Sequence, residues 1–138
     1  MNHRLTNSPF ALVVLVASFV LTGEAGAFDL NGAWAGDTDN CAKVFIRKGG
    51  QITFTDMSDV YGGGFIIDGN QITGKFARCQ IKARKDDGQD INLIAACATD
   101  IMLQHVQFNL RQIDADSVSR QFPGMEGMQI KYSRCPVQ

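Results

Sequence analysis

The sequence predicts an all-β protein, a small antiparallel barrel of about eight strands held by two disulfides. Short segments of alternating apolar and polar residues recur between turn residues, and no segment shows sustained helical spacing. Four cysteines follow an export signal, which is typical of a disulfide-bonded domain from an oxidising compartment. About eight strands are enough to close a barrel and so remove the exposed sheet edges.

The beginning of the chain has the pattern of a secretory signal peptide. Arg4 precedes an uncharged, mostly apolar run from Phe10 to Leu21, and Ala25-Gly26-Ala27 forms a small-residue cleavage site. The apolar run is shorter than the roughly 20 residues that span a bilayer, so we expect cleavage and no membrane anchor. The sequence therefore predicts a signal peptide over residues 1–27, a single domain over residues 28–138, and a periplasmic or secreted protein.

The expected strands follow from the apolar alternation and from the turns between them. They cover residues 30–35, 42–46, 51–55, 65–67, 71–83, 91–98, 106–113, 117–122 and 128–135. Asp68-Gly69-Asn70 is a hairpin turn, because Gly and Asn tolerate the positive φ that tight turns require. Within residues 71–83 the inward set changes phase, which predicts a β-bulge near Ala77. The short stretch 99–104 is ambiguous and is compatible with one helical turn.

The core of the barrel is expected to be filled by large side chains. Trp34 on the first strand is predicted to be a core residue at one end, with Gly32 leaving room for it. The expected inward set also contains four bulky side chains, Phe54, Phe76, Phe108 and Leu110. A filled interior leaves little space for a ligand.

The four cysteines allow three pairings. Cys41 to Cys79 and Cys97 to Cys135 span equal separations, and the KFARC that ends at Cys79 is similar to the KYSRC that ends at Cys135. This weak repeat favours Cys41–Cys79 and Cys97–Cys135. The alternative, Cys79–Cys97 across a hairpin with Cys41–Cys135 joining the chain ends, stays open.

Composition argues against several classes of function. The net charge is −1 for the whole chain and stays −1 without the signal peptide, which gives no footprint for nucleic acid. No C-x-x-C is present and His105 is the one histidine beyond the signal peptide, so we expect no metal and no cofactor. Because no acid, base and nucleophile can be assembled, we expect no enzyme.

Two loops are the candidate binding residues. Tyr61, Gly62, Gly63, Gly64 and Phe65 form a glycine-rich segment that lacks the Lys-Ser or Lys-Thr of a phosphate loop. The Gly- and Pro-rich segment FPGMEGM carries Phe122, Met125 and Met128. Exposed loops of this kind often contact partners, and Met is an adaptable apolar contact.

The run LNGAWAGDTDNCAKVFIRKGG, with Cys79 after the next hairpins, resembles the Inh-type inhibitors of secreted metalloproteases. Its NGAW segment alone is similar to the Gly-x-Trp start of lipocalins. Gly32, Trp34, Cys41 and Cys79 carry the resemblance, which implies an eight-stranded lipocalin-like barrel without catalytic machinery. In that inhibitor family a flexible N-terminal segment enters the protease cleft, whereas here only Phe28 and Asp29 precede the expected first strand. The resemblance therefore implies the fold more strongly than the target.

These observations favour a binding protein. We expect a non-catalytic inhibitor of a hydrolase, either a protease or a lysozyme, that acts through its surface loops. The alternative is a lipocalin-like carrier of a small apolar ligand in the barrel interior.

Overall fold

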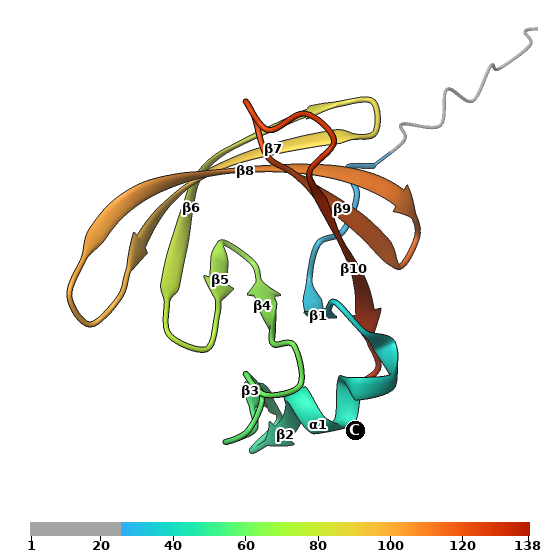
Figure 1. Cartoon of the computed structure of the whole chain (residues 1–138), viewed down its shortest axis with the longest axis vertical. Helices are drawn as coiled ribbons and strands as arrows, with labels where there is room; N and C mark the ends of the chain where they lie inside the picture. Colours follow the sequence, from blue (N-terminus) through green and yellow to red (C-terminus); the bar gives the residue numbers. More distant parts are fainter. Residues whose placement is uncertain (1–25) are drawn as a thin grey trace, which may run out of the picture.

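The computed structural model describes residues 26–138, and the predicted signal peptide lies outside them except for Gly26 and Ala27. Eight antiparallel strands close into a barrel in the order β1-β10-β9-β8-β7-β6-β5-β4 (Figure 1), which confirms the predicted fold class. The barrel strands are β1 (Gly32–Ala35), β4 (Gly64–Asp68), β5 (Gln71–Thr73), β6 (Arg78–Asp87), β7 (Asp90–Ala98), β8 (Leu103–Asp114), β9 (Ser117–Gln121) and β10 (Gln129–Cys135). Asp68 and Gln71 pair across the predicted Gly69-Asn70 turn.

A short excursion between β1 and β4 lies outside the barrel wall. It contains the 3₁₀ turn η1 (Thr38–Asn40), the helix α1 (Cys41–Val44) and a hairpin of β2 (Phe45–Lys48) and β3 (Gln51–Phe54). The expected strand over residues 42–46 is therefore wrong in its first half. Val44 and Phe45 are consecutive and both buried, whereas a strand would direct them to opposite faces. The change from helix to strand at Phe45 lets both side chains pack on the same wall.

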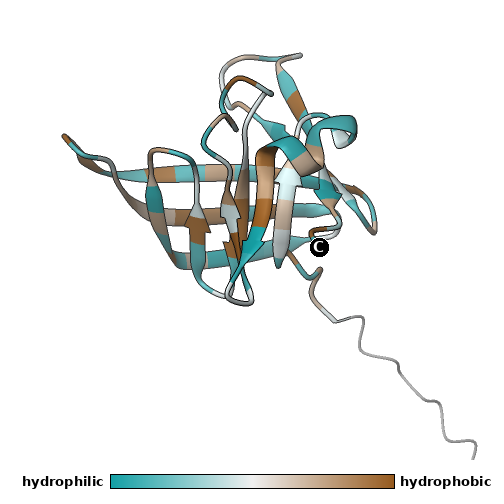
Figure 2. Ribbon diagram, turned by 90° about the horizontal axis from the view of Figure 1, so that it is seen from below, coloured by the Kyte–Doolittle hydropathy of each residue, from teal (hydrophilic) through white to brown (hydrophobic). Residues whose placement is uncertain are grey.

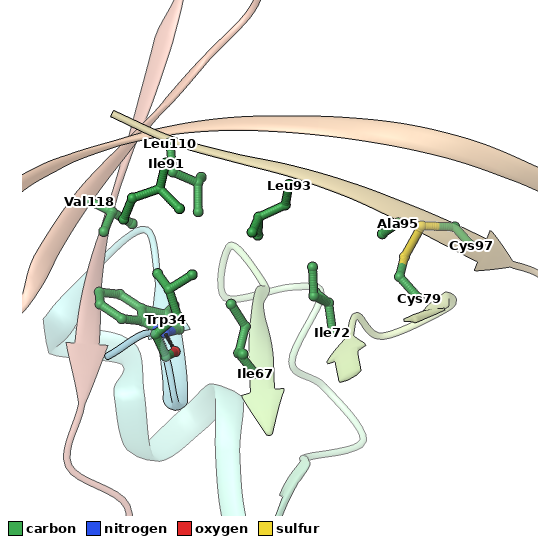
Figure 3. Close-up of a cluster of buried hydrophobic side chains, with 11 residues drawn as sticks. Trp34, Ile67, Ile72, Cys79, Ile91, Leu93, Ala95, Cys97, Leu110 and Val118 are labelled. Atoms are coloured by element: carbon green, nitrogen blue, oxygen red, sulfur yellow. Dashed lines mark hydrogen bonds between the residues drawn. A yellow bond between two sulfur atoms is a disulfide. The ribbon is translucent and has the colours of Figure 1, made fainter. Parts of the chain in front are cut away.

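Two apolar clusters result from this arrangement. The barrel interior holds the larger one, with Trp34, Ile91, Leu93 and Val118 fully or almost fully buried (Figure 3). Trp34, which the sequence places in the core, donates from its indole nitrogen to the Leu30 carbonyl at 2.9 Å. The second cluster lies between the outer wall of the barrel and the α1–β3 excursion.

The expected long strand over residues 71–83 is two strands, β5 and β6, that form an antiparallel hairpin. Ile72 pairs with Cys79, and the Gly74 amide donates to the Ala77 carbonyl at 2.8 Å to close the turn between them. The change of phase near Ala77 thus marks a chain reversal. The bulge in β6 lies further along, between Ile81 and Ala83.

The disulfides are Cys41–Cys135 and Cys79–Cys97, so the favoured pairing Cys41–Cys79 and Cys97–Cys135 is wrong. The barrel wall explains the difference. Cys79 and Cys97 face each other across β6 and β7 in the interior cluster, while Cys41 and Cys135 belong to the outer cluster. A Cys41–Cys79 bond would have to cross the wall. Two disulfides are compatible with a periplasmic or extracellular protein.

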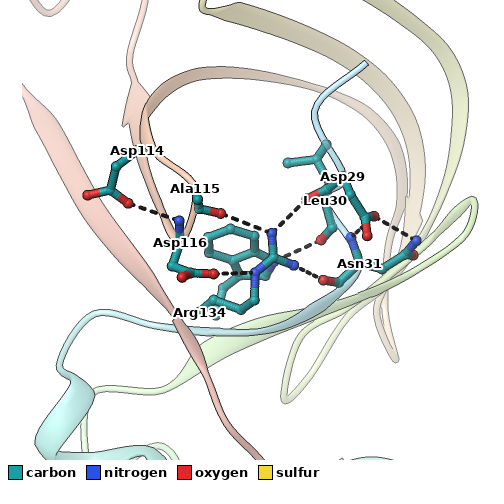
Figure 4. A network of polar contacts seen from close by, with 8 residues as sticks. Asp29, Leu30, Asn31, Asp114, Ala115, Asp116 and Arg134 are labelled. Atoms are coloured by element: carbon teal, nitrogen blue, oxygen red, sulfur yellow. Dashed lines mark hydrogen bonds and ion pairs between the residues drawn. The ribbon is translucent and has the colours of Figure 1, made fainter. Parts of the chain in front are cut away.

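One end of the barrel is closed by the segment that enters β1. Arg134 on β10 stacks its guanidinium 4.4 Å from the Trp34 ring and donates to the carbonyls of Asp29, at 2.7 Å, and Asn31 (Figure 4). It also pairs with the Asp116 carboxylate at 3.1 Å. Gly32 has φ +128, and a Cβ there would lie 3.3 Å from the Arg134 guanidinium. The room that Gly32 provides is therefore for Arg134, which in turn covers Trp34.

The opposite end is open, and one hairpin extends well beyond it. The antiparallel order places the connections 55–63, 74–77, 99–102 and 122–128 at this end. Strand β8 pairs with β9 only from Asn109 onward, so residues 103–108 pair with β7 alone. The β7–β8 hairpin consequently protrudes, and its tip is coloured as apolar at the left of Figure 2.

No helix among residues 26–138 has the length and apolarity needed to cross a bilayer.

Candidate binding site at the open end of the barrel

Both predicted loops lie at the open end, but their residues have different environments. Tyr61 is partly exposed, with the Lys43 ammonium 4.9 Å from its ring centroid, and Met125 and Met128 are exposed. Phe65 is half-buried instead, stacked on Trp34 with ring centroids 6.3 Å apart and edge-on to Tyr132 at 4.8 Å. The glycine-rich segment therefore ends in a core residue.

The glycines of this segment also divide into two kinds. Gly62 and Gly63 have φ values of +88 and +62 in an open turn, which glycine adopts without strain. Gly64 lies directly against the first strand, where a Cβ would overlap the Trp34 carbonyl oxygen. Gly64 thus permits close packing of β4 on β1, and it is a structural residue.

The open end contains a cavity of about 220 Å³. Its lining is mostly apolar and consists of Gly64, Phe65, Ile67, Ile72, Gly74, Ala77, Cys79, Leu93, Phe108, Leu110, Arg120 and Tyr132. The expectation of a filled interior is therefore wrong at the open end, although the buried cluster around Trp34 fills the rest. Phe108 and Leu110 do face the interior, but Phe54 lies in the outer cluster and Phe76 is 71% exposed in the β5–β6 turn. Because Phe54 and Phe76 lie outside the barrel, the remaining side chains do not fill its interior at this end.

Arg120 is the charged side chain that lines this cavity. Its guanidinium carbon lies 4.7 Å from the Phe108 ring centroid and 4.9 Å from that of Phe122. The predicted site residue Phe122 therefore lies next to the cavity, stacked on Arg120. The predicted residues Gly64 and Phe65 line the cavity directly. The structure thus brings parts of the two predicted loops to one cavity.

The two most exposed large apolar side chains among residues 26–138 are not among the predicted site residues. Ile101 is 91% exposed and Leu103 is 79% exposed at the tip of the β7–β8 hairpin, and Met102 between them is also exposed. The stretch TDIML carries three consecutive large apolar residues directly after the turn-forming Thr99 and Asp100. That juxtaposition is the signal that could have identified an apolar loop tip.

Local hydrogen bonds close the turn at the tip. The Thr99 amide donates to the Met102 carbonyl at 2.9 Å, and the Met102 amide donates to the Thr99 hydroxyl at 3.1 Å. The Cys79–Cys97 disulfide attaches β7 to the neighbouring strand β6 two residues before Thr99. Lys75 further braces this end, because its ammonium donates to the carbonyls of Thr55 and Asp56 at 2.7 and 3.0 Å.

The titratable groups with shifted pKa values lie away from the open end. A hydrogen bond from Arg84 lowers the pKa of Asp86, and a hydrogen bond from Arg111 lowers the pKa of Asp90. Both pairs are near the 88–89 turn at the closed end. Over residues 26–138 no group of three His, Cys, Asp or Glu side chains is arranged to hold a metal ion.

The fold and the site define an antiparallel barrel with a braced apolar hairpin and a small cavity at one end. No protein-family model, curated protein or solved structure matches this chain.

Proposed function

We propose that this protein is a non-catalytic binding protein that inhibits a hydrolase through the tip of the β7–β8 hairpin. The observation that carries the proposal is the exposure of Ile101 and Leu103, at 91% and 79%. Large apolar side chains gathered at an exposed site are typical of contact surfaces. Their burial against a partner contributes about 1.5–3 kcal/mol for each side chain.

The shape of the hairpin tip suits binding to a cleft on the surface of a hydrolase. Binding clefts of enzymes are concave and mainly apolar, with few polar groups. The hairpin tip is convex, it projects beyond the barrel, and its apolar side chains have the complementary character. The turn bonds at Thr99 and the attachment of β7 to β6 by Cys79–Cys97 restrain the hairpin, so less conformational entropy is lost on binding.

The closed end is less suited to this role. Residues 28–31 are tied down there by Arg134 and by Arg84, which donates to the Phe28 carbonyl at 2.7 Å. A mode of inhibition that uses a free N-terminal segment is therefore not the one we propose. The proposed contact lies at the other end of the barrel.

Inhibition can be tested with the purified, oxidised, exported protein. We expect it to lower the initial rates of a secreted zinc metalloprotease or of a lysozyme, with an endpoint at one inhibitor per enzyme. The double variant Ile101→Asp/Leu103→Asp should weaken inhibition at least tenfold, because two buried anchors are replaced by carboxylates. Ile113→Asp, at the far end of the same strand and 47% exposed, is the matched control. Equal inhibition by the double variant and the wild type would contradict the proposal.

The cavity favours a second candidate function, the binding of a small apolar ligand. An apolar cavity of roughly 150 Å³ is large enough for benzene. At about 220 Å³ the cavity here can take a ring or a short chain. Mass spectrometry of an organic extract of the natively exported protein should then reveal a stoichiometric small molecule, absent from an extract of the same protein unfolded and refolded in clean buffer.

A further inference from the structure

The cavity combines an apolar interior with one cationic side chain. Its inner part is formed by deeply buried residues, among them Leu93, Ile67 and Ile72. Arg120 lies toward the mouth, because it stacks on Phe122 of the 122–128 loop. The cavity therefore has an apolar end and a positively charged end.

Arg120 lacks the partner that a half-buried guanidinium usually has. In the part of the chain that the structure describes, carboxylates pair with Arg84, Arg111 and Arg134, and none pairs with Arg120. The rings of Phe108 and Phe122 interact with the guanidinium through their faces. Such stacking leaves the five N–H donors, which lie in the guanidinium plane, free to bind an acceptor.

We propose that the cavity binds a small amphipathic anion, with an apolar group against the half-buried rings of Phe65 and Tyr132 and a carboxylate on Arg120. This inference rests on the second candidate function and specifies its ligand class. A guanidinium and a carboxylate match in a planar, bidentate geometry. The apolar lining of Phe65, Phe108 and Leu110 lowers the local dielectric constant around such a pair, which strengthens it.

The size of the cavity limits the ligand. At about 220 Å³ it is below the 300–1,000 Å³ that drug-sized ligands occupy. A six-carbon chain or a single ring with one anionic group is the appropriate scale. A longer chain would not fit inside while its carboxylate stays on Arg120.

The test compares three ligands with the same chain and different head groups: hexanoate, hexan-1-ol and hexylammonium. Affinities come from NMR titration of the ¹⁵N-labelled, oxidised protein at neutral pH. We expect hexanoate to bind about tenfold or more tightly than hexan-1-ol, which is the factor that a charge-assisted hydrogen bond supplies. Hexylammonium should bind more weakly than either.

Variants locate the effect. Arg120→Met keeps the length of the side chain and removes the charge, and it should abolish the preference for hexanoate, while Arg120→Lys should keep part of it. Arg111→Met is the matched control, because Arg111 pairs with Asp90 on the outer face near the closed end. If Arg120→Met does not fold, the relative affinities of the three ligands for the wild type still test whether the cavity prefers an anion.

The outcomes separate this inference from the function on which it rests. Equal binding of hexanoate and hexan-1-ol would overturn the anion site and leave the carrier function standing. No binding of any of the three ligands would overturn both. Inhibition of a hydrolase is independent of all these results, since it concerns the hairpin tip.

Discussion

At the level of single residues, the glycine-rich segment 61–65 contains glycines with two different structural roles, turn formation and close strand packing. Gly62 and Gly63 adopt left-handed backbone conformations in an open turn, while Gly64 is pressed against the Trp34 carbonyl. Phe65, next in sequence, packs on the Trp34 ring. A pattern of three glycines flanked by aromatic residues does not distinguish these roles, because the distinction depends on which strand lies alongside.

The role of Gly64 leads to a prediction about stability. Gly64→Ala should lower the free energy of unfolding by about 1–3 kcal/mol, since the added methyl group forces β4 away from β1. Gly36→Ala is the control, because a Cβ at Gly36 meets no atom within 4 Å. The measurement is urea unfolding followed by the fluorescence of Trp34. A Gly64→Ala protein as stable as the control would show that the two strands are not in close contact there.

At the scale of elements, the sequence predicts the strands well where each alternates between a buried and an exposed face. Strand β7 follows this rule, with Ile91, Leu93 and Ala95 buried on one face, and it was predicted almost to the residue. The failures occur where a segment packs outside the barrel or reverses direction. Val44 and Phe45 are buried by an outer layer, and the break between β5 and β6 depends on strand pairing, so alternation alone does not reveal either.

The candidate site could likewise be predicted only in part from the sequence. Loop composition predicted Phe122 and the glycine segment, which do lie at the open end. The cavity could not be predicted, because it depends on Phe54 and Phe76 lying outside the barrel. Arg120 was missed because its significance comes from a position between two rings and beside the cavity.

The end of strand β6 provides a prediction about pH. The Asp86 carboxylate accepts a hydrogen bond from Arg84 at 2.7 Å, and its pKa is therefore lower in the folded protein than in the unfolded chain. The stabilisation is complete above the unfolded value of about 3.9 and is lost as the pH falls through the lower, folded value. Asp86→Asn should lower the free energy of unfolding by about 0.5–1 kcal/mol at pH 7.

This difference between wild type and Asp86→Asn should disappear in acid, once Asp86 is protonated in the folded state. Urea unfolding at a series of pH values from 7 to 2 measures it. Asp87→Asn, at the next and exposed position, serves as the control. A difference that stays constant down to pH 2 would mean that the effect of Asp86 is not electrostatic.

At the level of the whole molecule, the two disulfides stabilise different parts of the structure. Cys41–Cys135 has a sequence separation of 94 and attaches the outer layer to the end of β10, whereas Cys79–Cys97 has a sequence separation of 18 and lies within one sheet. The chain-entropy account gives a stabilisation of about 4.7 kcal/mol for the larger loop and about 3 kcal/mol for the smaller.

We therefore expect Cys41→Ser/Cys135→Ser to destabilise the protein more than Cys79→Ser/Cys97→Ser, by roughly 1.5 kcal/mol on this account. Unfolding of both double variants in urea under non-reducing conditions measures the difference. The smaller bridge should matter more for binding, because it braces the hairpin that carries Ile101 and Leu103. Greater destabilisation by loss of the smaller bridge would reverse this assignment.

We propose that recognition takes place at the open end, whereas the closed end stabilises the barrel. Hydrogen–deuterium exchange of the protein, alone and in complex with a hydrolase identified in the inhibition assay proposed above, tests this assignment. We predict slower exchange on binding at residues 99–104 and 122–128, and no change at residues 28–31 and 88–89. Protection confined to residues 28–31 and 88–89 would contradict the claim, because the contact would then lie at the wrong end of the barrel.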